Sequence, residues 1–253
     1  MTRRFSDAAC VFRIHLARVR SEAGPFLMAG IVFPCVMYLF ASGVASHGGD
    51  GLTPELRIRF LAGSIVFSLS MTAISWLGYL LLENRFTGRL KLFTTLPLAS
   101  SSYVFGIVVF AVAQAAIGTI SLLLVARAFG VAPALAGLGG AARLGAVLLL
   151  TVLCVSGISV VIAARARSFS EGSLATDALG AGLVFLAPVY YSPDALPRAL
   201  RLGAYVLPTT YAADGVRMLL GGGTAVGREL LVLALMSVVT LGTGFHVMRW
   251  REE

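Results

Sequence analysis

Residues 83–102, ENRFTGRLKLFTTLPLASSS, form a polar, charged interval between two apolar runs that are each long enough to cross a lipid bilayer. The large apolar side chains within it recur at offsets of four and three: Phe86, Leu90 and Phe93. This spacing is the period of an amphipathic helix that lies along a surface. Pro97 is expected to end that helix before the next apolar run begins.

A connection between two membrane spans needs only a few polar residues, so a structured amphipathic segment at this place indicates a docking site for another protein. The alternative is a helix that lies on the membrane surface without a protein partner. Both interpretations fit residues 83–102, which we call the polar segment.

The composition defines the class of protein. Of the 253 residues, 58% are hydrophobic and 13% are charged, whereas soluble domains carry about 25% charged residues. The chain is therefore predicted to be an all-α integral membrane protein with the lipid bilayer as its surroundings. Its net charge of +8 falls mostly on residues that flank apolar runs, where basic residues act as topology signals and contact anionic lipid, so no nucleic acid partner is expected.

Six apolar runs predict six transmembrane helices, because a crossing needs about 20 residues. They are residues 26–46, 60–82, 103–126, 144–164, 174–191 and 230–247. Residues 1–25 precede them and place arginines around a helical apolar spacing, which predicts an amphipathic helix at the membrane interface. The expected organisation is thus an interfacial helix (1–25) followed by a six-span domain (26–253), with His15 facing solvent or lipid.

Two polar side chains fall at membrane depth. Gln114, in the third predicted span, either forms a hydrogen bond between helices or contacts a substrate. Asp177, about one turn inside the fifth span, is either a functional carboxylate or the ion-pair partner of Arg165 or Arg167.

Residues 192–223, SPDALPRALRLGAYVLPTTYAADGVRMLLGGG, contain several helix breakers. Pro197 is expected to begin a helix too short to cross the membrane, and Pro208 to break it. Thr209 or Thr210 would cap a second short helix, which the three glycines at 221–223 would end. These features predict a re-entrant helical hairpin between spans five and six, buried against other helices or lining a cavity.

The distribution of basic residues gives the orientation. Six spans place both termini on one side, and twelve of the 20 basic residues then lie on that side against eight on the other. The positive-inside rule puts both termini and the polar segment in the cytoplasm, and the hairpin on the outer face.

Two motifs resemble the permease subunits of type-2 ABC transporters, and the likeness extends over essentially the whole chain. The first is Glu83, Gly88, Leu90, Leu92, Thr95, Pro97 and Leu98; the second is Pro193, Leu196, Pro197, Pro208, Thr210, Tyr211 and Arg217. Two positions depart from the family pattern: Arg85 stands where a second acidic residue is usual, and Leu207 where asparagine is common.

The resemblance implies a function and its site residues. A helix over residues 83–96 would be the coupling element that fits a cleft in a separate cytoplasmic ATPase. The residues that couple the two proteins would be Glu83, Arg85, Phe86, Gly88, Arg89, Leu90 and Pro97. An outer gate would include Pro193, Pro197, Pro208 and Tyr211. The chain itself would bind no cofactor, since ATP and Mg²⁺ would belong to the ATPase. A homodimer or a second permease would complete a pathway in the cell membrane that exports an amphipathic or hydrophobic substrate.

Other classes of membrane protein fit the residues less well. The single lysine, Lys91, lies in the context RLKL, so no phosphate-binding GxxxxGK[ST] loop exists and any ATP hydrolysis by that route needs a partner. A secondary transporter would need more intramembrane polar residues than Gln114 and Asp177, and broken helices in both halves. An intramembrane serine protease is disfavoured because the sequence around Ser156 lacks the second glycine of a nucleophile elbow.

Overall fold

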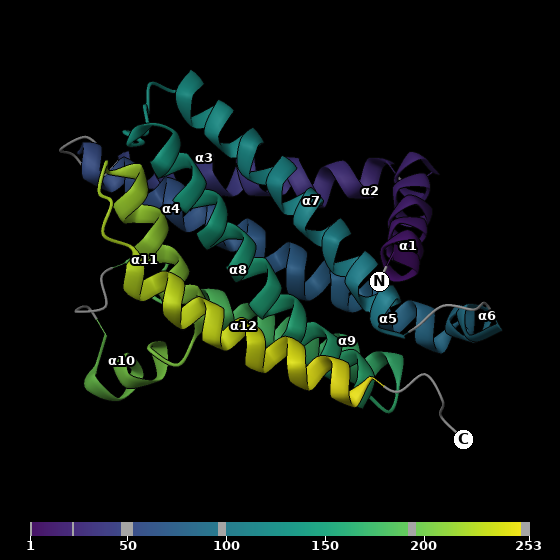
Figure 1. Ribbon diagram of the computed structural model, residues 1–253. Helices are drawn as coiled ribbons and strands as arrows, with labels where there is room; N and C mark the ends of the chain where they lie inside the picture. Colours follow the sequence, from purple (N-terminus) through teal and green to yellow (C-terminus); the bar gives the residue numbers. More distant parts are fainter. Residues whose placement is uncertain (1, 22, 47–52, 96–99, 192–195, 249–253) are drawn as a thin grey trace.

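The computed structural model describes residues 2–21, 23–46, 53–95, 100–191 and 196–248, and the regular elements in these ranges are helices (Figure 1). In chain order they are α1 (Thr2–Ser21), α2 (Ala23–Leu27), the π-helix η1 (Met28–Val32), α3 (Phe33–Ser46), α4 (Pro54–Met71), the π-helix η2 (Thr72–Trp76), α5 (Leu77–Phe86), α6 (Arg89–Thr95), α7 (Ser100–Ala128), α8 (Gly137–Arg165), α9 (Phe169–Phe185), α10 (Arg198–Ala204), α11 (Pro208–Leu220) and α12 (Gly227–Val247).

Four helical stretches in the described part of the chain are long and apolar enough to cross a membrane. They are Pro54–Phe86, Ser101–Ala128, Gly137–Arg165 and Gly227–Val247, and a shorter apolar helix covers Gly30–Val44. Each of these falls on a predicted span. The predicted span at 174–191 falls on α9, which has 17 residues and ends at Phe185, before the predicted boundary.

Local sequence explains where several helices begin. Thr53 caps α4, since its side chain accepts a hydrogen bond from the Leu56 N–H (3.3 Å) and Pro54 occupies the first turn. Ser168 caps α9 by accepting from the Glu171 N–H (3.1 Å). The Glu171 carboxylate in turn accepts from the Arg167 N–H (3.0 Å), which satisfies another free donor at this helix start.

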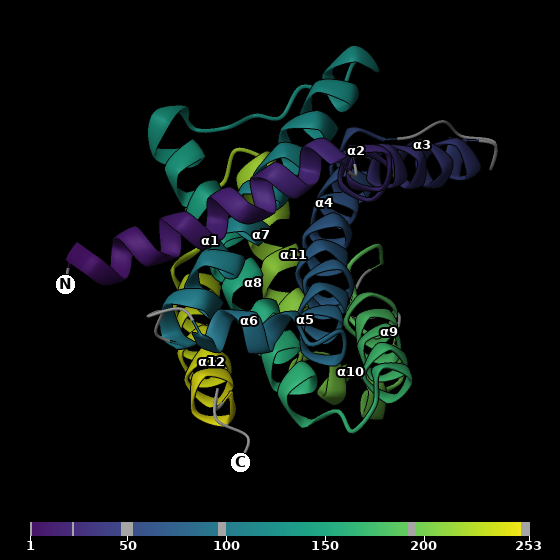
Figure 2. The ribbon, with the colours of Figure 1, turned by 90° about the vertical axis from the view of Figure 1, so that its right-hand side faces the viewer.

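The long helices pack lengthwise, and α1 lies across one end of them. Helices α8 and α12 lie side by side, with the Ser237 hydroxyl donating to the Leu150 carbonyl (2.8 Å). Figure 2 shows α1 crossing over α7, on which it packs. Figure 1 places α1, α6 and the end of α12 at one end of the molecule, which we call the α6 end. The opposite end, called the α11 end, carries α10, α11 and the turn between α7 and α8.

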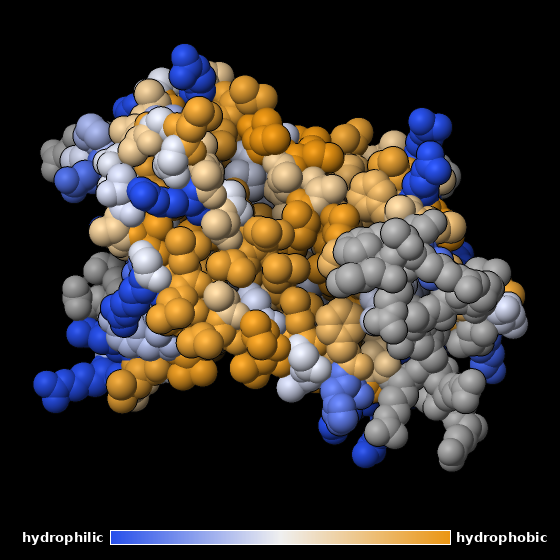
Figure 3. Space-filling view, viewed as in Figure 1, coloured by the Kyte–Doolittle hydropathy of each residue, from blue (hydrophilic) through white to orange (hydrophobic). Residues whose placement is uncertain are grey.

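Apolar side chains cover the middle of the molecule. Figure 3 shows them gathered across the face formed by α12 and its neighbours, with hydrophilic side chains toward both ends. Leu231, Leu235, Val238 and Val239 of α12 are all exposed. A wide apolar band between two polar ends is the surface that a membrane-spanning helix bundle presents to lipid.

A glycine of α7, Gly118, allows α7 to approach η1 closely. A Cβ atom added at Gly118 of α7 would lie 2.6 Å from the Gly30 carbonyl oxygen of η1, so only glycine fits there. Pro34 follows η1 and has no N–H to donate to the Gly30 carbonyl, which accounts for an irregular turn at this point.

The expectation for His15 was wrong, because α1 is packed against α7 and does not lie alone on a surface. The His15 side chain is only 5% exposed and its ring centroid lies 5.9 Å from that of Phe110. Burial, together with the nearby positive charge of Arg18, lowers the pKa of His15 to about 4. The imidazole is therefore neutral at pH 7.

Candidate functional site

The polar segment forms an elbow of two helices, and the prediction of one continuous amphipathic helix was wrong at Gly88. Helix α5 ends at Phe86, and Gly88 has a φ of +77°, a left-handed conformation that residues with side chains rarely adopt. Helix α6 then begins at Arg89 and projects from the α6 end of the molecule (Figure 1). Pro97 lies outside the described residues.

Three consecutive residues at the end of α5, Glu83, Asn84 and Arg85, contact different helices; we call them the ENR triplet. Glu83 accepts from two arginines: its Oε2 atom lies 2.9 Å from Arg18 Nη2 of α1, and its Oε1 atom lies 3.0 Å from Arg89 Nη1 of α6. A single carboxylate therefore joins α1, α5 and α6. Such charge-assisted bonds are the stronger class of protein hydrogen bond.

Asn84 ties α5 to α7. Its side-chain Nδ2 donates to the Tyr103 hydroxyl oxygen (2.9 Å), and both side chains are buried. The ring of Tyr103 also packs against Phe93 of α6, with 5.1 Å between the centroids. A buried polar pair of this kind is costly to break because each partner would then be left unsatisfied.

Arg85 binds the end of α8. Its Nη1 atom donates to the carbonyl oxygens of Ala163 (2.7 Å), Ala164 (3.0 Å) and Ala166 (2.9 Å). Ala163 and Ala164 lie in the last turn of α8, and Ala166 is its C-cap residue. At this end the helix carbonyls lack partners within the helix, and the helix dipole favours a cation. This gives a structural reason for an arginine at the position where the type-2 ABC pattern has an acidic residue.

The remaining residues of the predicted coupling set divide into a buried and an exposed group. Leu90 is half-buried against the core, whereas Phe86 and Arg89 are exposed. Leu92, the next apolar residue of α6, is 67% exposed. Helix α6 thus fixes one face to the bundle and leaves an apolar and basic face uncovered.

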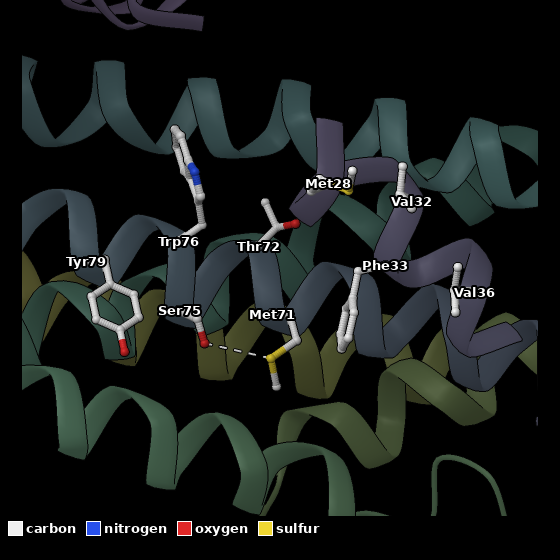
Figure 4. A pocket seen from close by; sticks show the side chains of 9 residues that line it. All are labelled: Met28, Val32, Phe33, Val36, Met71, Thr72, Ser75, Trp76 and Tyr79. Atoms are coloured by element: carbon white, nitrogen blue, oxygen red, sulfur yellow. Dashed lines mark hydrogen bonds between the residues drawn. The ribbon is translucent and has the colours of Figure 1, made fainter. Parts of the chain in front are cut away.

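A groove of about 530 Å³ lies between α3 and the α4–α5 rod (Figure 4). Both π-helices contribute to it, η1 through Met28 and Val32, and η2 through Thr72 and Trp76. Its lining is almost wholly apolar. Irregular π-helical turns are uncommon and are concentrated at functional sites, so two of them beside one groove mark it as a candidate binding site.

Tyr79 lies at the end of this groove that is nearer to the ENR triplet, and it contacts Asp177 of α9. The Tyr79 hydroxyl donates to Asp177 Oδ2 at 2.6 Å. The ion pair predicted between Asp177 and Arg165 or Arg167 is not formed; the carboxylate uses the tyrosine of a neighbouring helix as its partner. The exposed carboxylate is thereby fixed beside the groove.

Gln114 does not form the hydrogen bond between helices that the sequence suggested. The side chain is 2% exposed, and neither its amide nitrogen nor its oxygen finds a partner among the described residues. A Cβ atom added at Gly30 would lie 3.4 Å from the Gln114 Nε2 atom, so the amide sits beside η1.

Short helices α10 and α11 lie where the breakers predicted them. Pro208 begins α11 and Gly221 ends it, while Pro197 precedes α10. Neither threonine caps α11: Thr209 donates to the Leu183 carbonyl and Thr210 to the Ala204 carbonyl, each at 2.5 Å. Pro193 lies outside the described residues.

Side chains of α11 fix this region to its surroundings. The Tyr211 hydroxyl donates to the Tyr205 carbonyl oxygen at 2.9 Å. Arg217 donates to the Pro188 carbonyl beyond α9 and pairs with Asp214 at 3.5 Å.

Several of these contacts could not be predicted from the sequence. Asn84, Tyr103, Tyr79 and Arg18 were not singled out, because each becomes meaningful only through a partner that is distant in the chain. The sequence did offer one indication of these contacts, because the tyrosines Tyr79 and Tyr103 carry hydroxyl groups within apolar runs. Tyr79 lies about one helical turn before the polar segment, and Tyr103 directly follows it.

Comparison with known families identifies the class. The model of the ABC-2 type transporter family matches residues 8–220, and the chain belongs to this family. It is a multi-pass membrane permease of an ABC transporter, without a nucleotide-binding site of its own, and permeases of this kind work with separate ABC ATPase subunits. A comparison with curated protein sequences found no significant match.

Proposed function

We propose that the chain is the permease subunit of an ATP-driven exporter and that α6 is the surface on which its cytoplasmic ATPase docks. The observation that carries this proposal is the ENR triplet. Through it, Glu83 joins α6 to α1, and Arg85 fixes the adjoining end of α5 to α8. Asn84 ties the same end of α5 to Tyr103 of α7, on which Phe93 of α6 packs. A displacement of α6 would therefore be passed to three other helices at once.

The proposed topology has six crossings. The first would be α2, η1 and α3 together, and the fifth would be α9 with the residues that follow it to Tyr191. The other four are the long apolar stretches. Both termini and the α6 end would then lie in the cytoplasm, in agreement with the excess of arginine and lysine there.

The α10–α11 pair would form a re-entrant hairpin at the outer face. Its short helices and the side-chain bonds that satisfy the carbonyls of Leu183, Ala204 and Pro188 support this assignment. Backbone groups freed at a helix break inside a bilayer need such partners. The outer gate would include Pro193, Pro197, Pro208 and Tyr211.

The groove would be one wall of the substrate path, and a second permease, identical or different, would supply the facing wall. Its apolar lining suits an amphipathic or hydrophobic substrate. ATP and Mg²⁺ would be bound by the ATPase alone, and the chain would only receive the resulting movement.

The test is a Glu83→Gln variant in proteoliposomes that also hold the co-purified ATPase. We expect ATP-driven efflux of the dye Nile red to fall by at least tenfold while the two subunits still co-purify. The reason is that the neutral amide has a single acceptor oxygen and no charge, so it cannot hold both arginines. Glu55→Gln is the matched control, because Glu55 is an exposed carboxylate in the first turn of α4 at the other end of the rod. Normal efflux in the Glu83 variant would refute the assignment.

A further inference from the structure

The groove has an apolar lining, and the carboxylate of Asp177 lies just beyond one end of it, bonded to the lining residue Tyr79. Met28 and Val36 are exposed by 60% and 50%, so the groove is open along its side in this chain. Its size falls within the range of about 300–1,000 Å³ that is typical of sites for small organic molecules. At the end of the groove that is nearer to the ENR triplet, the Tyr79 hydroxyl forms a hydrogen bond with Asp177.

Among the residues that the structure describes, the Asp177 carboxylate has no counter-ion. Its side chain is exposed in the middle of α9, and its Oδ2 atom accepts a hydrogen bond from a neutral hydroxyl group. No arginine or lysine of the described chain forms an ion pair with it. In the proposed topology this carboxylate lies at membrane depth, where a charge without a cationic partner is costly and is by default a candidate for binding a cation or a proton.

The backbone on both sides of the groove departs from regular α-helical geometry. Both walls are interrupted by a π-helix at the same level, η1 on one side and η2 on the other, and these two segments contact each other. Each extra residue in a π-turn displaces side chains from the regular helical register. Trp76 is held in place by Phe110 on its far side, with ring centroids 5.2 Å apart. This leaves a firm apolar wall next to the charge.

From these features we infer that the groove binds a hydrophobic organic cation, with its apolar body between η1 and η2 and its amine nitrogen at Asp177. The inference deepens the proposed function by giving the substrate class. Charge complementarity carries it: a carboxylate beyond the end of an apolar groove, with no cationic partner in the described part of the chain, favours a positively charged amphiphile over a neutral one or an anion. Tyr79 is a positioning residue, because its hydroxyl fixes the carboxylate.

The experiment measures dye binding to the permease in nanodiscs made only of phosphatidylcholine. Rhodamine 6G is a hydrophobic cation with N–H groups, and Nile red is a neutral dye of similar size. For Asp177→Asn we expect the Kd for rhodamine 6G to rise by about tenfold or more, which corresponds to the loss of about 1.4 kcal/mol, while the Kd for Nile red stays unchanged. Tyr79→Phe should raise the rhodamine Kd by a smaller factor, and Asp177→Glu should restore it.

Glu171→Gln is the control, because it removes a negative charge from the same helix outside the groove. An unchanged rhodamine Kd in Asp177→Asn would overturn the inference, as would an equal loss for both dyes. Displacement of rhodamine 6G by added phosphatidylethanolamine would assign the groove to a membrane lipid and also overturn it. In each case ATP-driven Nile red efflux that depends on Glu83 would leave the proposed function standing.

Discussion

The α6 end and the groove differ in what holds them together. At the α6 end, neighbouring helices are joined by directional bonds from the ENR triplet, with lengths of 2.7–3.0 Å. At the groove the contacts are apolar, two helices depart from regular α geometry, and the Tyr79–Asp177 bond is the main polar link. The first region suits the transmission of a movement, and the second suits a change of shape around a bound molecule.

The largest expected effect comes from Gly88→Pro, which tests whether the α6 end transmits movement. Proline fixes φ near −65°, whereas Gly88 has a φ of +77°, so the elbow between α5 and α6 cannot form. We expect complete loss of ATP-driven efflux with membrane insertion intact, as measured by dye transport and by the yield of monodisperse protein.

Gly130→Pro is a closely matched control. Gly130 has a φ of +76° in the turn between α7 and α8 at the α11 end, so the strain is similar but its place differs. Its efflux should stay within a fewfold of the parent protein. Equal loss of transport in both variants would mean that the elbow has no special role.

The next largest effect should come from filling the groove. Val36→Trp adds a bulky ring to a half-exposed lining position of α3. We expect the Kd of both dyes to rise by about tenfold while the basal ATP hydrolysis of the complex is unchanged. Val44→Trp, at an exposed position of the same helix outside the groove, is the control. A parallel loss of basal hydrolysis would show that the two regions are not separate.

Arg85→Ala should be milder and should weaken only the α6 end. It leaves the terminal carbonyls of α8 without their cation, which costs about 2–3 kcal/mol. Hydrogen exchange should rise in the last turn of α8 and not in η1. Arg85→Lys should recover part of the loss, since lysine supplies the charge without the planar fork. Faster exchange in η1 instead would contradict the division into two regions.

The smallest effect concerns pH and the docking of α1. Because the folded-state pKa of His15 is about 4 and the unfolded value is about 6.5, the unfolded state binds more protons between these values. Stability is therefore full above pH 6.5 and falls as the pH drops toward 4, by about 2 kcal/mol at pH 5. Hydrogen exchange in α1 should accelerate over this window, and His15→Phe should abolish the dependence. A pH dependence that persists in His15→Phe would assign it to another group.

Much of the fold was predictable, because apolar runs of about 20 residues carry a strong local signal. Proline and glycine likewise marked the short helices α10 and α11. The orientation of a buried side chain was harder to predict. His15 was misplaced since nothing in residues 1–25 shows that α7 covers them. For Asp177, one of the two alternatives paired it with nearby arginines, whereas its partner, Tyr79, lies 98 positions away in sequence.

The candidate site shows the same limit. The polar segment was identified by its charge. Within it, Glu83 and Arg85 form bonds between helices, and Gly88 forms the turn between α5 and α6. Which helix each would contact depends on tertiary packing, which periodicity does not report. The two π-helices were beyond prediction, because a single inserted residue leaves almost no trace in a hydropathy pattern.

The central claim is that a separate ATPase docks on α6, and photo-crosslinking tests it directly. A benzophenone amino acid at Leu92, an exposed position of α6, should crosslink to the ATPase in membranes. The same group at Leu138, 92% exposed at the α11 end, should not. Crosslinking from position 138, or none from position 92 in a complex that still hydrolyses ATP, would contradict the account.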